Sequence, residues 1–423
     1  MKGLLIFLML FVQTLFAQNT ISLLDCYSEA MKSDPLSRDK SNYKSINDLN
    51  IKNLKIAWMP KVEVNGQATY QSDVTHIPNI QIPNTPIAIN IPQMQKDMYK
   101  LTLDISQTIY DGGVTARQKL FQIASLAVDS QQVTVELNQL KTQVNQIYFS
   151  ILLLQNQKKL IENINQNISE KIKQVESGVR NGTLLASALD ILKVQQLKLM
   201  EQTTEIDYSV SSGIKILGIL IGKNLDEKIQ LIYPDFLMKQ NNIYKRPEFV
   251  LFNLQKDRLD QSIRLSSTER MPKLFGFGQA GYGRPGLNML NNSFSSFYYV
   301  GAGLKWTLWD WNKVNRQKQI FSIQKELIET RKLSLEKNLS IEMERELSEF
   351  NKYEELIQKD NEIIALRNKI TQNASSQMMN GSITATDYLT ELNSETQEKI
   401  NLETHKIQAL QAKINYLTLK GDL

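Results

Sequence analysis

The sequence contains little of what metal centres and nucleophilic active sites are built from. Its 423 residues include one cysteine, Cys26, and two histidines, His76 and His405. A Cys/His metal site or a Cys–His nucleophile pair is therefore almost excluded, and the chain has no disulfide of its own. No Ser/His/Asp arrangement or carboxylate pair is recognisable either. We expect no enzyme activity, no metal and no cofactor.

Long runs of charge and of apolar residues are also missing. The 49 basic and 44 acidic residues give a net charge of +5, and no Lys/Arg run is dense enough for binding nucleic acid. After the N-terminus no stretch supplies about 18 continuous apolar residues, the minimum for a membrane-spanning helix. Any insertion into a membrane must therefore use strands.

The first residues, MKGLLIFLMLFVQTLFAQ, predict a secretory signal peptide over residues 1–17. Lys2 precedes a short apolar core, and Ala17 is the small residue expected before cleavage. A membrane anchor is the less favoured alternative because the core is too short to span a bilayer stably. Lipidation of Cys26 is disfavoured by Asp25 before it, so we interpret Cys26 as a small apolar residue on a helix.

Two pairs of alternating segments predict two β-hairpins. Residues 62–70 and 100–110 alternate apolar with polar side chains, the second up to Ile109. Residues 274–282 and 297–311 repeat this plan as two strands in the second half. The last alternation runs from Tyr298 through Trp306 to Leu308 on one face. Strands of about ten residues suit a tilted crossing of an apolar layer. A soluble sandwich with an aromatic core remains the alternative.

Each hairpin is followed by a very long helix and a return helix. Apolar residues recur in steps of three and four over 114–179 and 314–364, and no proline occurs between Pro92 and Pro234. This heptad-like pattern predicts helices of about 100 Å, at roughly 1.5 Å per residue. Return helices are expected over 184–220 and 383–419, and short helices on both sides of Pro35.

The two halves repeat one plan. IYDGGVTARQK aligns with LWDWNKVNRQK, and RNGT with MNGS, so that Asp111 and Asp310 lie 199 residues apart (310 − 111), as do Gly182 and Gly381. Such self-similarity indicates internal duplication. We therefore expect a signal peptide (1–17), a first repeat of strand hairpin and long helix pair (18–222), a connecting segment (223–245) and a second such repeat (246–423).

Four strands in one chain would leave two open sheet edges, which neither hydrocarbon nor water tolerates well. Three chains would close twelve strands around a water-filled lumen. The expected fold class is thus a mixed α and β membrane protein, a trimeric 12-stranded β-barrel continued by a long α-helical coiled-coil tunnel.

This plan resembles the TolC family of outer-membrane efflux proteins over nearly the whole chain after the signal peptide. The resemblance rests on the duplicated order, the strand entries at Pro60 and Pro272, and the phrases around Asp111 and Asp310. It implies a homotrimer in contact with outer-membrane lipid, with its helical portion in the periplasm. It also implies docking on a periplasmic adaptor (membrane fusion) protein fed by an inner-membrane pump, and no nucleic acid.

The resemblance implies two kinds of site at the helix turns. The adaptor-docking tips map to Asn181, Gly182, Thr183 and Leu184, and to Asn380, Gly381, Ser382 and Ile383. The alternative is that these are only helix turns in which glycine adopts the left-handed conformation. The periplasmic aperture maps to Asp387, with Thr390 where the family can have a second aspartate, and to Asp190 in the first half.

Three copies of Asp387 near an axis would repel one another, raise at least one pKa and attract cations. A solvated surface carboxylate is the alternative. The tyrosine and arginine that lock the closed tip in some family members correspond to Met378 and Ile383, so this chain departs from the family's latch at both positions. For Asp111 and Asp310, at the strand–helix junctions, helix capping is favoured over a role in conduction.

Three functions are compatible with these sequence features. The leading one is the channel component of a tripartite efflux system, a passive duct energised by its partners. The second is the duct of a type I protein secretion system. The third, a coiled-coil envelope scaffold without a pore, predicts helices alone, and the two strand–helix junctions argue against it.

Overall fold

The computed structural model describes residues 20–75, 80–81, 88–89, 93–238 and 244–423. The expected signal peptide lies outside these residues. The chain divides into two compact units, which we describe separately. One comprises Met1–Lys40, Ser130–Leu251 and Thr330–Leu423, and the other Ser41–Asp129 and Phe252–Glu329. The second of these contains the main sheet, and we call it the strand unit; the first is the helical unit.

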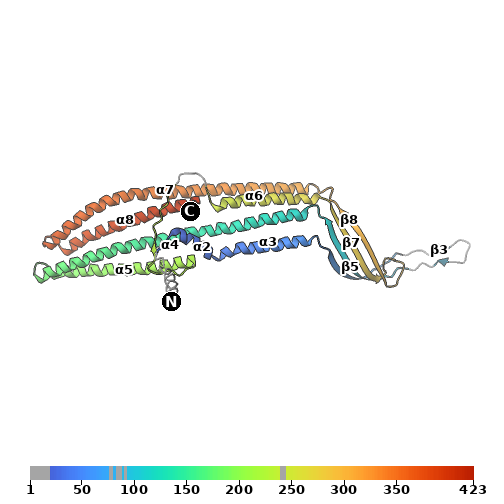
Figure 1. Cartoon of the computed structure of the whole chain (residues 1–423), viewed down its shortest axis with the longest axis horizontal. Coiled ribbons are helices and arrows are strands. Elements are labelled where there is room, and N and C mark those ends of the chain that lie inside the picture. The colour runs from blue at the N-terminus through green and yellow to red at the C-terminus, as the bar shows by residue number, and fades with distance from the viewer. Residues whose placement is uncertain (1–19, 76–79, 82–87, 90–92, 239–243) are drawn as a thin grey trace, which may run out of the picture. The chain divides into compact units, whose positions relative to one another are not determined.

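The strand unit is built on a four-stranded antiparallel sheet (Figure 1). Its strands are β2 (Lys61–Tyr70), β5 (Asp97–Tyr110), β7 (Lys273–Arg284) and β8 (Ser295–Lys305), in that spatial order. The central pair joins the two predicted hairpins, so β2 and β8 form the edges. Two-residue strands β3 (Ile80–Gln81) and β4 (Ala88–Ile89) pair in the loop between β2 and β5.

One detail of the expected strands is wrong, namely the end of the last strand. The strand β8 ends at Lys305, because its partner β7 begins at Lys273 and offers no further backbone groups. Trp306 and Leu308 therefore lie beyond the sheet. In β5 the register shifts between Thr108 and Tyr110, which places Tyr110 opposite Leu274. Ile109 still lies on the expected apolar face, where a Cβ on Gly276 would be 3.5 Å from its side chain.

The helices reproduce the duplication residue for residue. The outgoing helices α4 (Val114–Arg180) and α7 (Lys313–Met379) each have 67 residues, and the return helices α5 (Ala186–Ile221) and α8 (Ala385–Lys420) each have 36. Their first residues differ by 199 (313 − 114 and 385 − 186), the offset found in the sequence. Uninterrupted three- and four-residue apolar spacing without proline accounts for these lengths.

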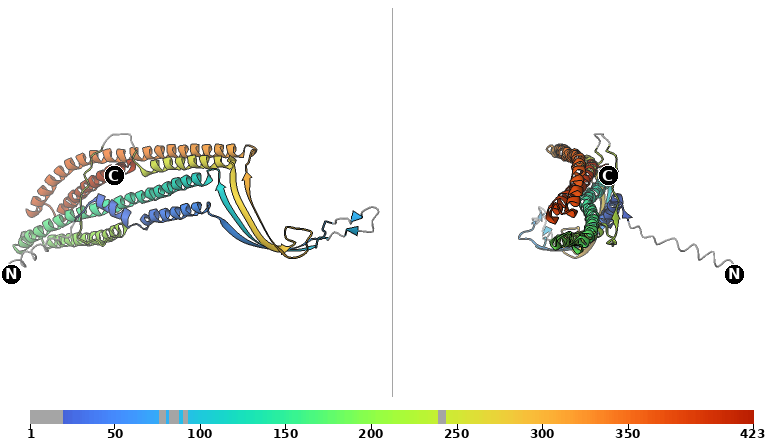
Figure 2. Two further views of the ribbon diagram at one scale, coloured as in Figure 1. Left: turned by 45° about the vertical axis from the view of Figure 1, so that its right-hand side comes forward. Right: turned by 90° about the vertical axis from the view of Figure 1, so that its left-hand side faces the viewer.

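In the helical unit, α5 runs back beside α4, and α8 beside α7 (Figures 1 and 2). The short helix α2 (Leu23–Ser33) begins with a capping box between Ser22 and Asp25. It leads through a 3-10 turn at Pro35–Arg38 to α3 (Asp39–Ile56), most of which belongs to the strand unit. Helix is therefore present on both sides of Pro35, as expected.

The buried core of the helical unit gathers around the phenol ring of Tyr148. Its hydroxyl group donates one bifurcated hydrogen bond to the backbone carbonyls of Ile21 and Ile232, at 3.0 and 2.6 Å. These carbonyls flank a parallel two-residue ladder between β1 (Thr20–Ile21) and β6 (Gln230–Leu231). A buried hydroxyl that satisfies two carbonyls ties the connecting segment to α4. Cys26 is fully buried in the same core, and burial raises its thiol pKa to about 12.

The strand unit also contains most of α6 (Pro247–Ser266), which continues into a 3-10 turn at Ser267–Arg270. Two ion pairs hold α6 to the first part of α7, namely Lys256 with Glu329 and Lys325 with Asp260. Among the helices that the structure describes, none has an 18-residue window that is apolar and uncharged enough to cross a bilayer.

Candidate functional site

The two faces of the four-stranded sheet differ sharply in polarity. The register places Val64, Leu103, Ala280 and Tyr298 on one face, which we call the apolar face. Its only charged residues are Asp97 and Arg284, which pair with each other at one end of the sheet. The opposite face, which we call the polar face, carries polar and charged residues such as Glu63, Asn65, Lys100, Thr102, Asp104 and Gln279, and in β7 and β8 also the aromatic residues Phe275, Phe277 and Tyr299.

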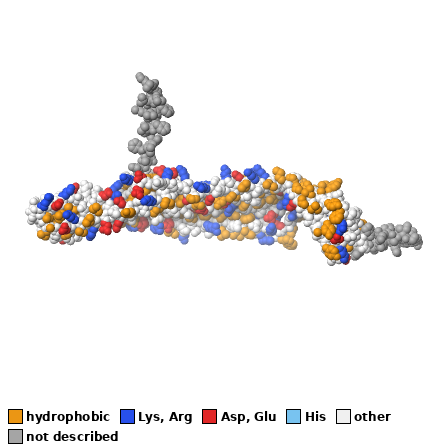
Figure 3. All heavy atoms as spheres, turned by 90° about the horizontal axis from the view of Figure 1, so that it is seen from below, with side chains coloured by type: hydrophobic (Ala, Val, Ile, Leu, Met, Phe, Trp, Pro, Cys, Tyr) orange, Lys and Arg blue, Asp and Glu red, His pale blue; other side chains and the backbone are white. Residues whose placement is uncertain are grey.

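The apolar face is open in the single chain. Exposed fractions reach 79% for Val300, 76% for Tyr298 and 68% for Val64. Hydrophobic side chains gather over the strand unit in the space-filling view (Figure 3). A contiguous exposed apolar surface of this kind marks an interaction site.

Among the residues that the structure describes, the outer edges of the sheet, along β2 and β8, are paired with no further strand. Each edge presents backbone N–H and C=O groups without ladder partners, over 10 residues in β2 and 11 in β8. Such edges pair readily with strands of another chain.

The strand–helix junctions carry the two predicted aspartates. Asp111 accepts the backbone N–H groups of Gly113 and Thr115 at 2.8 and 2.7 Å. Asp310 accepts those of Asn312 and Val314 at 3.0 and 3.1 Å. Both carboxylates thus accept hydrogen bonds from backbone N–H groups at the start of a long helix, which have no partner within the helix. This is the helix capping expected from the sequence.

The second junction is reinforced by an arginine that was not predicted from the sequence. Arg270 forms a bidentate ion pair with Asp310, with Nε and Nη2 each 2.9 Å from a carboxylate oxygen. This hydrogen-bonded pair lowers the pKa of Asp310 from 3.8 to about 2. At Asp111, burial raises the pKa, but the hydrogen bonds from Thr115 and Gly113 outweigh it and the net shift is downward.

The backbone at both junctions takes the left-handed conformation twice in succession. Gly112 and Gly113 have φ of +70° and +84°, whereas their counterparts Trp311 and Asn312 reach 52° and 64° without being glycine. The tryptophan therefore holds a strained conformation, of order 1–3 kcal/mol. Its indole ring is 78% exposed and packs edge-on against Trp309 at 5.9 Å.

The predicted docking tips are two turns of the same type. At the first, Gly182 N–H donates to the Val179 carbonyl at 3.1 Å and Thr183 N–H to the Gly178 carbonyl at 2.9 Å. At the second, Gly381 and Ser382 repeat these bonds to Met378 and Gln377, at 3.0 and 2.9 Å. This pattern is the Schellman motif, and φ values of +71° and +72° explain the glycines.

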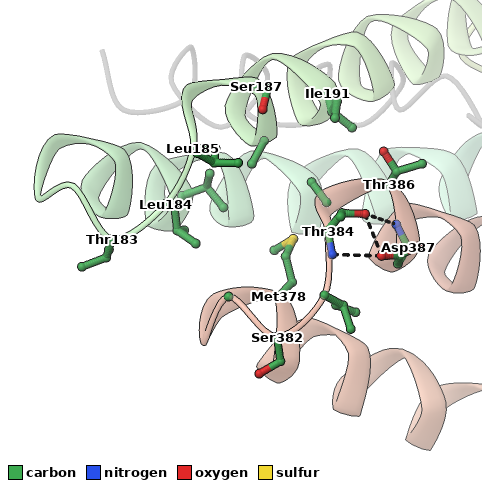
Figure 4. Close-up of a pocket in the computed structure, with 15 residues that line it drawn as sticks. Thr183, Leu184, Leu185, Ser187, Ile191, Met378, Ser382, Thr384, Thr386 and Asp387 are labelled. Carbon is green, nitrogen blue, oxygen red and sulfur yellow. Dashed lines mark hydrogen bonds between the residues drawn. The ribbon is translucent and has the colours of Figure 1, made fainter.

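A groove of about 600 Å³ lies between the two turns (Figure 4). Among the predicted tip residues, it is lined by Thr183, Leu184, Gly381, Ser382 and Ile383. The first residues of each turn, Asn181, Gly182 and Asn380, do not line it. Of the predicted aperture residues, Asp387 lines the groove, whereas Asp190 and Thr390 do not.

Asp387 has a local role that was not predicted. Its carboxylate accepts the backbone N–H and the hydroxyl group of Thr384, at 2.9 and 2.7 Å, and its own N–H donates to that hydroxyl at 3.2 Å. This is a capping box at the start of α8. The Thr-x-x-Asp spacing is the sequence signal from which it could have been predicted. Within the single chain, the hydrogen bonds from Thr384 lower the pKa of Asp387.

The first tip lacks this cap. The N-cap residue of α5 is Leu185, whose side chain makes no capping hydrogen bond and is 75% exposed. A polar N-cap typically contributes about 1 kcal/mol relative to an apolar one. An exposed leucine at this position is therefore better explained by a contact outside the chain than by helix stability.

The two positions that correspond to the family's latch, Met378 and Ile383, pack in or beside an apolar core. Met378 is 2% exposed and belongs to the apolar core beneath the tips, together with Val175 and Leu192. Ile383 packs at the edge of that core. Neither side chain offers a hydrogen bond that could hold a closed tip.

We predict that Asp310→Asn destabilises the protein at neutral pH, because it removes the charge that pairs with Arg270. The pKa of Asp310 is depressed, so its contribution is present above about 3.8 and disappears as the pH falls through about 2. The heat-unfolding midpoint measured by circular dichroism should lie below that of wild type at pH 7, and this difference should become much smaller at pH 2, where about half of the Asp310 carboxyl groups are protonated. A difference of the same size at both pH values would contradict the assignment. Asp111→Asn, without an arginine partner, is the matched control and should have the smaller effect.

Comparison with known proteins gives a structural match without a sequence match. No family model and no curated protein matches the chain. Among solved structures, CusC is 12% identical, with 94% of this chain and 91% of that chain covered and a TM-score of 0.64. The outer membrane protein VceC from Vibrio cholerae is 13% identical, with 94% and 96% covered and a TM-score of 0.63.

The outer membrane channel MtrE from Neisseria gonorrhoeae, in its open state, is 11% identical, with 94% and 88% covered and a TM-score of 0.62. These TM-scores establish the fold, over almost the whole length of both chains. They confirm the fold expected from the resemblance noted in the sequence. The chain has the fold of the TolC-family outer-membrane efflux channels.

Proposed function

We propose that three copies of this chain form a passive exit duct in the outer membrane. The duct is the channel component of a tripartite efflux system, docking on a periplasmic adaptor that is fed by an inner-membrane pump. The observation that carries this proposal is the four-stranded sheet, with one apolar face, one polar face and two unpaired edges.

The unpaired edge strands β2 and β8 allow the sheets of several chains to join into a closed barrel. When β8 of one chain pairs with β2 of the next, three chains complete a twelve-stranded barrel and leave no sheet edge unpaired. The apolar face then contacts lipid, and the polar face lines a lumen. The proposed division into repeats 18–222 and 246–423, joined by 223–245, supplies one hairpin per repeat. We propose that residues 1–17 direct export.

The helices extend the duct into the periplasm. Each 67-residue helix is about 100 Å long, at 1.5 Å per residue. The tips around Gly182 and Gly381 are the proposed adaptor contacts, supported by the groove between them and by the exposed, non-capping Leu185. Asp387, with Thr390 and Asp190, is the proposed periplasmic aperture.

The first test is single-particle imaging of the mature protein extracted from outer membranes in detergent. We expect a threefold particle with a short barrel and a hollow helical tube of about 100 Å. A monomer, or a solid helical bundle without a lumen, would refute the channel and favour a scaffold.

A second prediction concerns the docking tips. Gly182→Asn and Gly381→Asn retain the left-handed turn, because asparagine tolerates positive φ. Each adds a side chain where an added Cβ meets nothing within 4 Å. We expect trimers to assemble normally while drug sensitivity rises toward that of cells lacking the protein.

The matched control for these variants is Gly113→Asn. Gly113 also has positive φ and open space around an added Cβ, but it lies at a strand–helix junction. It should leave drug sensitivity unchanged. Wild-type sensitivity in both tip variants would show that the docking assignment is wrong.

A third prediction concerns the aperture. Asp387→Asn removes one charge per chain near the tip, so cation selectivity should decrease in reversal-potential measurements on planar bilayers. Asp226→Asn, in the loop after α5, is the control and should have no effect. Unchanged selectivity in Asp387→Asn would remove this residue from the aperture.

A further inference from the structure

Two lysines lie opposite each other at the helix-proximal end of the sheet. Lys273 begins β7, Lys305 ends β8, and the register pairs them directly. Both belong to the polar face. Each is next in sequence to a residue of the apolar face, Leu274 or Leu304, and successive side chains of a strand point to opposite faces. Like charges in directly opposed positions destabilise a sheet. The pair therefore calls for an explanation other than stability.

The acidic groups nearby are already engaged. Asp310 is paired with Arg270, and Glu269 with Lys313 at 2.8 Å. Within the described part of the chain, no salt bridge involves Lys273 or Lys305. Among these same residues, the two ammonium groups are thus left without an anionic partner on the sheet.

The acids on the polar face itself are also occupied. Glu63 pairs with Lys61 at 2.7 Å. Asp104 accepts hydrogen bonds from Asn65 and Thr102, at 2.6 and 2.9 Å, and from Gln279. Gln279 lies six residues along β7 from Lys273, about 20 Å at 3.3 Å per residue. Neither acid neutralises the lysine pair.

Aromatic side chains adjoin the lysines on the same face. Phe275 and Phe277 follow Lys273 on β7, and Tyr299 lies diagonally across on β8. The rings touch in sequence, with centroids 6.1 Å apart for Phe275–Phe277 and 6.2 Å for Phe277–Tyr299. Phe275 is 38% exposed, Phe277 37% and Tyr299 42%.

Glycines opposite the phenylalanines let these rings lie flat against the sheet. A Cβ at Gly303 would be 2.4 Å from the Phe275 ring, and one at Gly301 would be 2.7 Å from the Phe277 ring. Any larger residue would push the rings away. The result is a low aromatic surface directly beside two positive charges.

We infer that Lys273, Lys305, Phe275, Phe277 and Tyr299 form a binding station for organic anions that combine an apolar or aromatic body with a carboxylate or sulfonate group. The ammonium groups bind the anion, and the rings bind its body by stacking and apolar contact. The inference rests on the proposed duct, in which this face lines the lumen, and it names a class of cargo.

Symmetry would multiply the station. In a closed barrel the strand next to β8 is β2 of the neighbouring chain, which begins with the self-neutralised pair Lys61–Glu63. The neighbour's strand therefore adds no net charge where the two meet. Three stations would surround the lumen and favour amphiphilic anions over cations on their way out.

The test measures current block in planar bilayers containing the full-length trimer. Naphthalene-2-sulfonate is the probe, and methanesulfonate is the same anion without the ring. We expect naphthalene-2-sulfonate to reduce the single-channel potassium chloride current at concentrations well below those of methanesulfonate. In the double variant Lys273→Gln and Lys305→Gln, the half-blocking concentration should rise by about tenfold or more, as the loss of charged hydrogen bonds implies.

Two further variants separate the elements of the station. Lys100→Gln, on the same face but toward the other end of the sheet, is the matched charge control and should leave the block unchanged. Phe277→Leu keeps an apolar side chain over Gly301 and removes the aromatic ring. It should weaken naphthalene-2-sulfonate block several-fold while leaving the chloride-to-potassium permeability ratio unchanged.

The outcomes distinguish the station from the duct. A conducting channel with the same block in the double variant, or with an equal loss in Lys100→Gln, would overturn the station and leave the duct intact. Equal block by methanesulfonate would also overturn it, since the rings would then contribute nothing. A trimer without any conductance would overturn the duct and the station together.

Discussion

The unpaired backbone groups along β2 and β8 constrain everything else about this protein. A sheet with one exposed apolar face cannot remain open at both edges in lipid, because each unsatisfied N–H or C=O group costs several kcal/mol there. With four strands per chain, pairing between copies removes both edges at once. The proposed lumen, the lipid contact and the threefold symmetry of the tunnel all follow from this closure.

The two repeats have identical helix lengths but different ends. The second repeat uses a capping box at Thr384 and Asp387, and an arginine bound to the junction aspartate. The first has an uncapped leucine at the equivalent tip and glycines at the equivalent junction. Duplication thus preserved the length of the scaffold, while each end acquired its own local interactions. The exposed Leu185 and the strained Trp311 are the residues that stability alone explains least.

Two opposite charge preferences occur along the proposed duct. Asp387 lies beside the groove between the tips, and hydrogen bonds from Thr384 keep its pKa low, which favours the anionic form. The lysine pair Lys273 and Lys305 lies on the polar face of the sheet beside exposed aromatic rings. A duct with this arrangement does not act as a uniform filter for one sign of charge. It provides separate positions at which charge and shape of a cargo count.

The sequence by itself determined the periodic elements and their duplication. Local spacing of apolar residues and the absence of proline fixed both ends of α4 and the start of α7 to within one residue, and the 199-residue offset fixed the repeats. The predicted spacing extends only to Ile364 in the second half, whereas α7 ends at Met379. Only the tertiary structure decided which residues meet. The partner of β5, the end of β8 at Lys305, the pairing of Arg270 with Asp310 and the opposition of Lys273 to Lys305 depend on strand register and on contacts between distant segments. Alternation in a strand specifies its faces but not its neighbour, and that is why these features could not be predicted from the sequence.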